Sequence, residues 1–419
     1  MKRVLRAVLL LGLAMACCGP AAAQPPNAKA AEYNNMGIAA YNAGHYSESI
    51  RYFEKAHELA RDNRTVRHNL CNAQQAMANE LAKGNKLAEA VELLKTAIGV
   101  EPENPGPLTQ LGSYHLQQGE VQQAIFRLEE AIELKPGELT AHELLGEAYY
   151  RDNDLPAARV QWDYVLQLEP KRKGLKERYE KAFREESVEN GYRRGESRHF
   201  KVSCPPDTPS MVRSQALTAL ERAYLQITRR VGGTHPPSPI QVVLYGEGEF
   251  SAATQTEEHI AAIYDGKIRS PLIGPDGRYL DEDELGRRLT HEYVHVVLRH
   301  LAGNGIPWWL NEGMAQTLSQ DFGHAETMLL RKAQDEGGLF NLKALEAHQL
   351  KALAAEPLNI AYAQAHAAVL TLWDRYGQRP FQQMLREING GNAPEKALRN
   401  TYRLTYAALQ QEVLNRIAD

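Results

Sequence analysis

Two histidines one helical turn apart, with a glutamate beside the first, are the residues of this chain best suited to chemistry. His291 and His295 are four positions apart, and Glu292 directly follows the first of them. On a helix, residues i and i+4 share one face, so both imidazoles can bind one metal ion from the same side. Glu292 is turned about a quarter of the way around the helix, close to that ion without having to ligate it. The spacing is typical of zinc hydrolases, in which the glutamate takes a proton from a zinc-bound water.

The residues around this pair predict a helix with defined ends. Asp281 supplies a capping residue, and Asp283 and Glu284 place acidic charges in the first turn. An apolar stripe continues as far as Val296, and the turn at 303–305 ends the helix. This helical context argues against a chance match of the five-residue pattern.

A third ligand for such a metal lies shortly after the helix. A catalytic zinc ion takes three protein ligands and keeps an open fourth position. The segment 306–315 follows the turn, and Pro307 can open a second helix with Glu312 about one turn inside it. The competing layout, with histidine as third ligand, needs a glycine and a histidine at positions 298 and 301, where this chain has leucines. The sequence therefore predicts a metal site made of His291, His295 and Glu312.

The pairing of His-Glu-x-x-His with a following Trp-Leu-Asn-Glu-Gly segment resembles the gluzincins, the peptidase MA-like group that includes thermolysin. The resemblance implies Zn2+ as cofactor, Glu292 as the base, and His291, His295 and Glu312 as ligands. It extends over most of residues 195–419 and rests mainly on the two motifs.

Two positions depart from that family. Only 16 residues separate His295 from Glu312, a shorter connection than thermolysin-like enzymes use. Gln316 stands where those enzymes have an aspartate that orients a ligand histidine, so that orienting contact is not expected here.

A later segment offers candidates for stabilising the oxyanion of the reaction. Residues 360–370 predict a long helix, with Tyr362 and His366 four apart and therefore on one side. Peptide hydrolysis needs a hydrogen-bond donor at the developing oxyanion, and either residue could supply it. Tyr362 is favoured because related gluzincins often use a tyrosine. The alternative is that both residues pack in the core.

Strand-like segments precede the zinc motif and indicate an α+β domain. We expect strands at 199–204 and 240–245, with a helix at 210–231 between them. A hairpin is expected to join 261–264 to 267–273, with its turn at positions 265–266. In gluzincins, an edge strand upstream of the zinc helix binds extended substrate, and the segment 268–273 resembles it in position. The alternative is an ordinary edge strand blunted by Pro271.

Residues recur at a fixed interval between the N-terminus and the zinc motif. Prolines at 102, 136 and 170 are spaced by 34 positions, as are alanines at 90, 124 and 158. This interval is the tetratricopeptide period. Small residues such as Gly112 and Ala124 let two antiparallel helices approach closely. In the second copy Ala90 follows Ser49 by 41 positions, and seven extra residues add about two helical turns.

We therefore predict four tetratricopeptide repeats over residues 31–171. The resemblance to this family implies a concave surface for peptides or partner proteins; the alternative is that the repeats only brace the catalytic domain. Residues 172–196 are expected to form a capping helix and a linker, the linker lying over 190–197, and residues 197–419 the metallopeptidase domain. The predicted fold class is an α-helical tetratricopeptide solenoid followed by an α+β zincin-like metallopeptidase domain.

Residues 1–23 have the composition of an export signal. Lys2 and Arg3 precede an apolar run, and the small residues up to Ala23 resemble a cleavage site. The run is shorter than the ~20 apolar residues of a membrane-spanning helix, so no transmembrane span is expected in the mature chain. A lipid anchor on Cys17 or Cys18 is the alternative mode of processing. The protein is therefore expected to be exported, either periplasmic or secreted.

The composition argues against one class of partner. A formal net charge of −4, without a long Lys/Arg-rich block, gives no reason to expect nucleic-acid binding. The remaining cysteines, Cys71 and Cys204, fall in different predicted domains, and their spacing does not indicate a disulfide.

The function predicted from these features is an exported zinc metallopeptidase. Its repeats would recruit a protein substrate or a partner protein. The alternative is a tetratricopeptide scaffold or assembly protein with an inactive zinc-binding domain.

Overall fold

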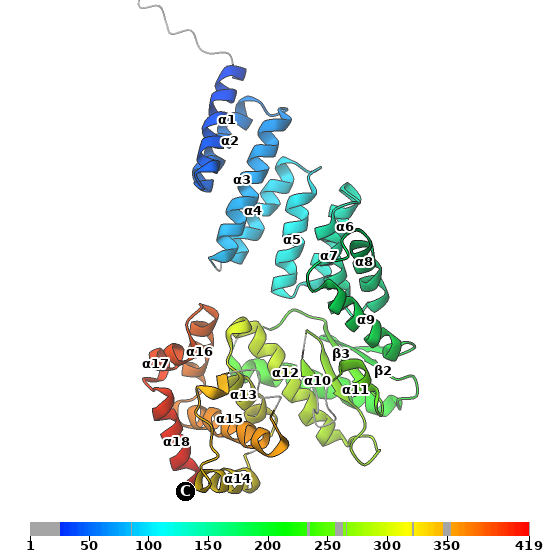
Figure 1. Ribbon diagram of the computed structural model, residues 1–419, viewed down its shortest axis with the longest axis vertical. Coiled ribbons are helices and arrows are strands. Elements are labelled where there is room, and N and C mark those ends of the chain that lie inside the picture. Colours follow the sequence, from blue (N-terminus) through cyan, green and yellow to red (C-terminus); the bar gives the residue numbers. More distant parts are fainter. Residues whose placement is uncertain are drawn as a thin grey trace, which may run out of the picture. The chain divides into compact units, whose positions relative to one another are not determined.

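The computed structural model describes residues 26–84, 86–232, 235–255, 263–264, 266–320, 322–346 and 353–418. The chain divides into two compact units, Met1–Glu103 and Asn104–Asp419. Figure 1 shows the helices and strands of both units. The predicted export signal, with Cys17 and Cys18, lies outside the described residues.

The described part of the first unit contains two helix pairs, α1 (Pro26–Asn42) with α2 (Tyr46–Leu59) and α3 (Arg64–Lys83) with α4 (Leu87–Val100). The first pair approaches closely because Gly37 has no side chain: a Cβ atom there would lie 2.6 Å from the Phe53 ring. α3 has 20 residues, whereas α5 (Pro105–Gln118), its counterpart in the next repeat, has 14. The extra residues of the second repeat therefore lengthen one helix.

The second unit begins with two more helix pairs of the same kind. α5 pairs with α6 (Val121–Leu134), and α7 (Leu139–Arg151) pairs with α8 (Leu155–Leu168). A Cβ atom at Gly112 would lie 2.6 Å from Leu128 Cγ, and one at Gly146 would overlap the Trp162 ring. The close contact within each pair therefore requires the small residues on which the repeat prediction was based.

After the repeats, α9 (Leu175–Glu189) is the expected capping helix, but the segment after it is not a linker. Within 190–197, the strand β1 (Arg193–Glu196) pairs antiparallel with β2 (Phe200–Cys204). The residues of β1 are charged or glycine and carry no apolar alternation. The strand is held by its backbone pairing with β2, and the sequence pattern gave no sign of it.

One five-stranded sheet forms the centre of the C-terminal region, in the order β1-β2-β3-β5-β4. β2, β3 (Ile240–Tyr245) and β5 (Ile268–Pro271) run parallel, with α10 (Ser210–Val231) between β2 and β3 in the chain. β4 (Ile263–Tyr264) pairs antiparallel with β5, as in the predicted hairpin, of which residues 261, 262 and 265 lie outside the described residues. The expectation that 268–273 is the edge strand is wrong for its first two residues, because Ile268 and Arg269 pair with β4, which lies at the edge of the sheet.

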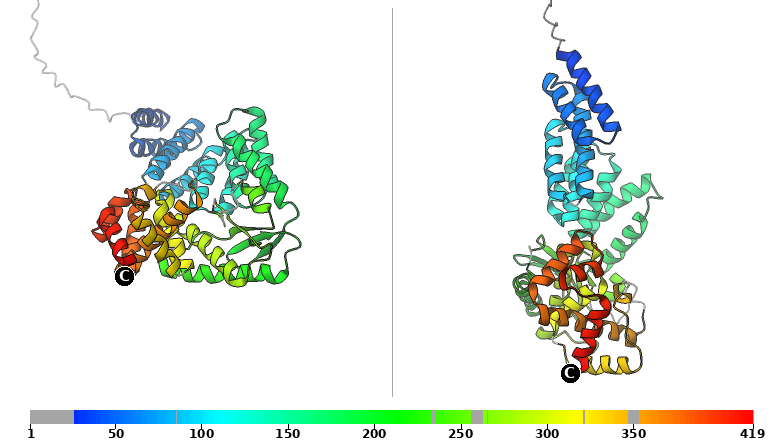
Figure 2. Two further views of the ribbon diagram at one scale, coloured as in Figure 1. Left: turned by 60° about the horizontal axis from the view of Figure 1, so that its bottom comes forward. Right: turned by 90° about the vertical axis from the view of Figure 1, so that its left-hand side faces the viewer.

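The two faces of the sheet pack against different helices. Val242, Leu244 and Ile268 belong to the main core, with residues of α10 and of α12 (Glu282–Ala302). The alternate residues Val243 and Tyr245 pack with α11 (Glu249–Thr254) and with the end of α9. The sheet therefore lies between helices on both sides, as Figure 2 shows. The cap of the repeats belongs to one of these layers.

The rest of the second unit is helical and encloses the apolar side of α12. It comprises α13 (Trp308–Ser319), α14 (His324–Asp335), α15 (Ala355–Tyr376), α16 (Gln378–Asn389), α17 (Pro394–Tyr402) and α18 (Tyr406–Ala418), with short 3-10 turns at Gly303–Gly305 and Ala344–Glu346. The predicted fold class, a helical repeat region followed by an α+β domain, is confirmed.

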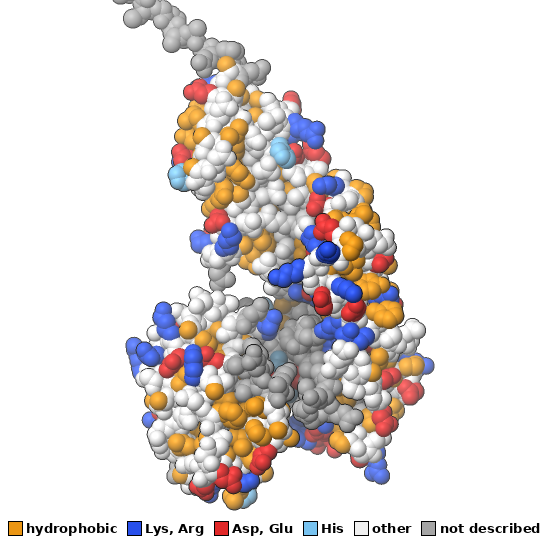
Figure 3. Space-filling view, viewed as in Figure 1, with side chains coloured by type: hydrophobic (Ala, Val, Ile, Leu, Met, Phe, Trp, Pro, Cys, Tyr) orange, Lys and Arg blue, Asp and Glu red, His pale blue; other side chains and the backbone are white. Residues whose placement is uncertain are grey.

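On the face shown in Figure 3, acidic and basic side chains are interspersed over the described surface. Cys71 and Cys204 are both buried, and they are not bonded to each other. Among the described helices, none has the length and apolarity of a membrane span.

Candidate active site

The helix α12 presents both histidines, and its ends lie where the sequence places them. Asp281 caps the helix: its Oδ1 accepts a hydrogen bond of 2.8 Å from the backbone N–H of Glu284. At the other end Gly303 has a φ of +66°, a backbone conformation that favours glycine. The helix is therefore fixed at both ends around its central turn, which carries His291 and His295.

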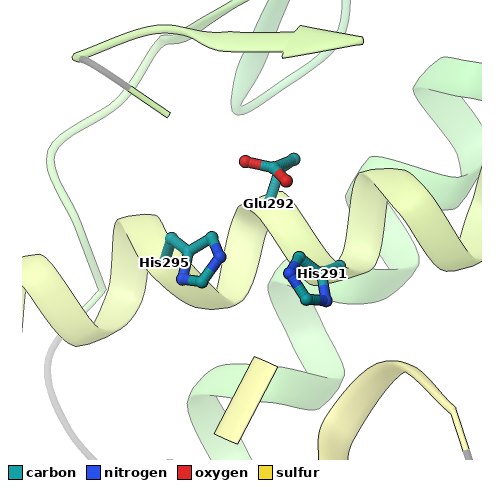
Figure 4. Close-up of side chains that lie close together, drawn as sticks. All are labelled: His291, Glu292 and His295. Atoms are coloured by element: carbon teal, nitrogen blue, oxygen red, sulfur yellow. The ribbon is translucent and has the colours of Figure 1, made fainter. Parts of the chain in front are cut away.

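The imidazoles of His291 and His295 lie side by side on α12. Their ring centroids are 4.8 Å apart and the rings are nearly perpendicular, at 86°. Figure 4 shows both rings on one side of the helix, while the carboxylate of Glu292 projects from another side, toward the strand above the helix. One ligand atom from each of these three residues lies within 4.8 Å of the other two. The arrangement predicted from the i, i+4 spacing is therefore present.

Glu312 of α13 completes a triangle of donor atoms. Its Oε2 lies 3.5 Å from His291 Nε2 and 3.6 Å from His295 Nε2. Two ligands of a tetrahedral zinc ion with bonds of about 2.1 Å are about 3.4 Å apart. Two imidazole nitrogens and a carboxylate oxygen are also a donor set that zinc uses. The residues present therefore fit zinc in both spacing and chemistry.

A close contact between two helices positions Glu312. The next residue, Gly313, packs against α15, and a Cβ atom there would overlap the backbone oxygen of Ala365 and approach Val369 Cγ2 at 2.7 Å. Trp308 and Trp309, in the first turn of α13, are both buried. The depth at which α13 can approach α15 therefore depends on Gly313. Reasoning from the sequence missed this role, although the glycine directly follows a ligand.

Glu292 is almost fully buried, with 4% of its surface exposed. It lies on the part of α12 that faces the hairpin, since both β4 and β5 contact this helix. Among the described strands β4 lies at the edge of the sheet, the position at which an extended peptide can add as a further strand. A peptide added there would pass close to the side of α12 from which Glu292 projects.

The structure separates the two candidates on α15. Burial raises the pKa of the Tyr362 hydroxyl, and the negative charges of Glu312 and Glu292 raise it further. Tyr362 therefore lies within electrostatic reach of both carboxylates, and its ring packs against Trp308 at 5.1 Å between centroids.

His366 is not brought to the site. It is fully buried, its Nδ1 lies 2.9 Å from Glu326 Oε1 of α14, and its ring meets Phe322 edge-on. Side chains four positions apart on a helix are separated by about 6 Å along its axis. A shared helix face therefore did not imply a shared site, because one turn further along α15 the neighbouring element is α14.

The surroundings of the ligand His295 differ from the thermolysin pattern, because Gln316 replaces the aspartate of those enzymes. His295 Nδ1 and Gln316 Oε1 are both buried, and neither has a hydrogen-bond partner among the described residues. In metal sites the second nitrogen of a ligating histidine usually donates to a carboxylate, carbonyl or water. Gln316 Oε1 does not make that contact.

Comparisons with known proteins agree with this architecture. Residues 222–419 match the family model of the Peptidase MA superfamily. Residues 30–63 and 109–171 match tetratricopeptide-repeat models. The second helix pair, which has the long α3, lies between the two repeat matches. A comparison with curated proteins gave no match.

The solved structures that resemble the chain include several tetratricopeptide-repeat proteins. The first repeat domain of Spaghetti (RPAP3), bound to an HSP90 peptide, is 21% identical over 27% of this chain and 92% of its own, with a TM-score of 0.27. YrrB is 15% identical over 36% and 92%, with a TM-score of 0.27. pilF of Pseudomonas aeruginosa is 17% identical over 49% and 87%, with a TM-score of 0.31.

The family models and the site geometry lead to one assignment. The histidine pair, Glu312 and the helices that carry them lie within the range matched by the superfamily model. The repeat matches lie wholly before this range. The chain therefore carries a domain of the peptidase MA superfamily, preceded by tetratricopeptide repeats.

Proposed function

We propose that this protein is an exported zinc-dependent metallopeptidase that hydrolyses peptide bonds. The observation that carries the proposal is the triangle formed by two imidazole nitrogens and Glu312 Oε2, whose sides of 3.5 and 3.6 Å suit ligands of one zinc ion. The superfamily match supports peptidase chemistry at this position in the chain.

His291, His295 and Glu312 would hold the metal. When bound, zinc supplies a Lewis acid that polarises the scissile carbonyl and lowers the pKa of the attacking water. Three protein ligands would leave a catalytic zinc ion one position for water or substrate.

Glu292 is proposed to transfer the proton of the reaction. Its carboxylate accepts a proton from the attacking water as oxygen bonds to the carbonyl carbon. It then delivers that proton to the amine nitrogen as the C–N bond breaks. Its position beside the ligand turn, on the side of the hairpin, supports this role.

Tyr362 is proposed to donate a hydrogen bond to the developing oxyanion. A donor must keep its proton, and the raised pKa of this hydroxyl keeps it protonated through neutral and mildly alkaline pH. The positions of Glu312 and Glu292 near the same hydroxyl support its place in the site.

The repeats and the N-terminus suggest where and on what the enzyme acts. Tetratricopeptide repeats imply binding of a protein or peptide partner, and we propose that this partner includes the substrate. The signal-like residues 1–23 support export to the periplasm or the exterior, with lipid attachment at Cys17 or Cys18 as the other form of processing.

Metal analysis combined with a peptide-library cleavage assay tests the proposal. Purified wild-type protein should contain one zinc per chain and cleave peptides in the library. Glu292→Gln should keep the zinc and lower kcat/KM by about 1,000-fold, because it removes only the base. Glu282→Gln, an exposed glutamate in the first turn of the same helix, serves as the matched control and should keep wild-type activity.

Two results would contradict the proposal. One is a purified chain that does not bind zinc stoichiometrically. The other is a Glu292→Gln variant that cleaves as fast as the control. Zinc binding without any cleavage by wild type would favour the scaffold alternative.

A further inference from the structure

Four charged side chains are buried together where α9 meets the sheet. Glu185 and Glu189 come from α9, while Arg269 lies on β5 and Lys267 directly precedes that strand. Glu185, Lys267 and Arg269 are fully buried, and Glu189 is 8% exposed. The cluster contains two positive and two negative charges and lies on the sheet face opposite α12.

The opposite charges are in direct contact. One Arg269 nitrogen donates to Glu185 Oε2 at 2.9 Å, and the other lies 3.6 Å from Glu189 Oε1. The ammonium group of Lys267 lies 3.6 Å from the same Glu185 oxygen. Burial of an ion costs several kcal/mol, so such a cluster persists only when its members pair closely.

Neutral side chains satisfy the remaining hydrogen-bonding atoms. Tyr150 donates to Glu185 Oε1 at 2.9 Å, and Tyr245 donates to Glu189 Oε1 at 2.7 Å. Both hydroxyls also accept hydrogen bonds from the Arg269 guanidinium. Asn153 accepts from Lys267 at 2.6 Å and donates to Glu189 at 3.0 Å. We call these seven residues the cap network: Tyr150, Asn153, Glu185, Glu189, Tyr245, Lys267 and Arg269.

The cap network connects the last repeat with the catalytic sheet. Tyr150 belongs to α7, and Asn153 lies in the turn before α8, where it adopts a left-handed φ of +61°. The same turn binds the sheet at a second point, because Asp152 Oδ1 accepts from Gln241 of β3 at 2.9 Å. The fourth repeat and its cap are therefore attached to the sheet through specific polar contacts.

The strand β5 lies between the cap network and the zinc helix. Successive side chains of a strand point to opposite faces. Arg269 accordingly faces α9, while the neighbouring Ile268 is buried in the core that contains Leu289 and Tyr293 of α12. β5 also holds the edge strand β4, with Ile263 paired to Arg269 and Tyr264 paired to Ile268.

We propose that Glu185 and Glu189 are positioning residues for the active site, acting through β5. By fixing Arg269 and Lys267 they set where β5 and the edge strand β4 lie relative to α12, and hence where an extended peptide meets Glu292. The catalytic part of this statement rests on the proposed function; the coupling of α9 to the hairpin does not.

Hydrogen exchange in the full-length protein tests the coupling directly. Glu185→Gln keeps the shape of the side chain and an acceptor for Tyr150, but removes the charge that faces Arg269 and Lys267. We expect amide exchange in β4 and β5 to rise by at least about tenfold, with β2 unchanged, because the loss is local to the hairpin. The matched control is Glu180→Gln, an exposed glutamate of the same helix, which should leave exchange unchanged.

Kinetics then test the catalytic consequence. With an extended peptide substrate, KM of Glu185→Gln should rise by about three- to tenfold, while zinc content stays at one per chain and kcat changes less. Arg269→Lys keeps the positive charge but replaces the two guanidinium nitrogens that face Glu185 and Glu189 with a single ammonium group. It should give a smaller change in the same amides, and it replaces Glu185→Gln if that variant does not fold.

Three outcomes would overturn the proposal. The first is exchange in β4 and β5 equal to that of the Glu180→Gln control. The second is a uniform increase across the sheet including β2, which would indicate only a loss of global stability. The third is faster amide exchange in β4 and β5 together with an unchanged KM. Absence of cleavage by the wild-type enzyme would count against the proposed peptidase and leave the exchange test intact.

Discussion

The metal site and the cap network each contain two carboxylates, but the groups opposite those carboxylates differ. At the metal site, Glu312 faces two imidazole nitrogens, which like the carboxylate are electron-pair donors. In the cap network, Glu185 and Glu189 face a guanidinium and an ammonium group. The first cluster is a donor set for a cation, whereas the second contains its own cations. The metal site is therefore suited to binding a cation, whereas the cap network stabilises the contact between α9 and the sheet.

The largest effect is expected from removing a ligand. Glu312→Gln should weaken zinc binding by at least about 100-fold and abolish hydrolysis, because a neutral amide is a poor zinc ligand. Glu185→Gln, the same chemical change in the cap network, should leave zinc affinity unchanged. Competition with a chromogenic chelator measures both values. Equal zinc affinities for the two variants would remove the distinction between the clusters.

The next effect concerns the oxyanion donor. Tyr362→Phe should lower kcat by about 100-fold and leave zinc content unchanged, since it removes one hydrogen bond made in the transition state. The raised pKa of Tyr362 also predicts that the wild-type enzyme loses no activity through this group between pH 6 and about pH 9.

His366→Gln provides the comparison on the same helix. It should lower stability, because it disturbs the contact with Glu326, and keep kcat per zinc-loaded molecule. Initial rates and zinc content measured on the two variants assign the donor. A larger kcat loss in His366→Gln than in Tyr362→Phe would reverse the assignment.

A third prediction concerns the packing that supports the metal site. Gly313→Ala should destabilise the second unit by about 1–3 kcal/mol, because its methyl group would overlap the backbone of α15. Gly286→Ala, in α12, is the control. Its methyl group would meet only Ala219 Cβ at 3.8 Å, and alanine should stabilise that helix by about 0.5–1 kcal/mol. Denaturant unfolding measures both, and a neutral Gly313→Ala would show that α13 can shift without cost.

The smallest effect is expected where an ion pair is partly exposed. Burial alone would raise the pKa of Glu143, but hydrogen bonds from Arg178 and Arg172 outweigh it and lower the pKa. A lowered pKa in the folded state stabilises the protein above the ordinary carboxyl pKa, and the contribution is lost as the pH falls through the folded pKa.

Glu143→Gln should therefore cost about 1 kcal/mol at pH 7, and the difference from wild type should shrink below about pH 4. Thermal melts between pH 7 and pH 3 measure it. A difference that grows toward low pH would have the wrong sign and would contradict the assigned pairing.

Relations between residues close in the sequence could be predicted better than contacts between residues far apart in it. The histidine pair and the cap at Asp281 depend on spacing within one helix, and Glu312 follows shortly after a turn. These local relations could be predicted. His366 could not be placed, because its neighbour is determined by how α15 crosses α13 and α14.

Buried charges were the hardest features to predict from the sequence. Lys267 and Arg269 have the appearance of an ordinary polar strand, and Glu185 that of a solvated helix face. Arg269 and Glu185 are 84 residues apart in the chain. Only the three-dimensional arrangement shows that each compensates the other. The strand β1 was missed for a related reason, because its pairing partner rather than its own side chains determines it.

The cap network also determines where this protein can be divided or transplanted. A fragment starting at residue 197, where the sequence places the domain boundary, would lack β1 and both glutamates of α9. Its remaining sheet would present Lys267 and Arg269 to solvent as unneutralised charges on a surface meant for packing. A catalytic fragment, or a chimaera with foreign repeats, needs to begin upstream of α7. The unit starting at Asn104 meets that requirement.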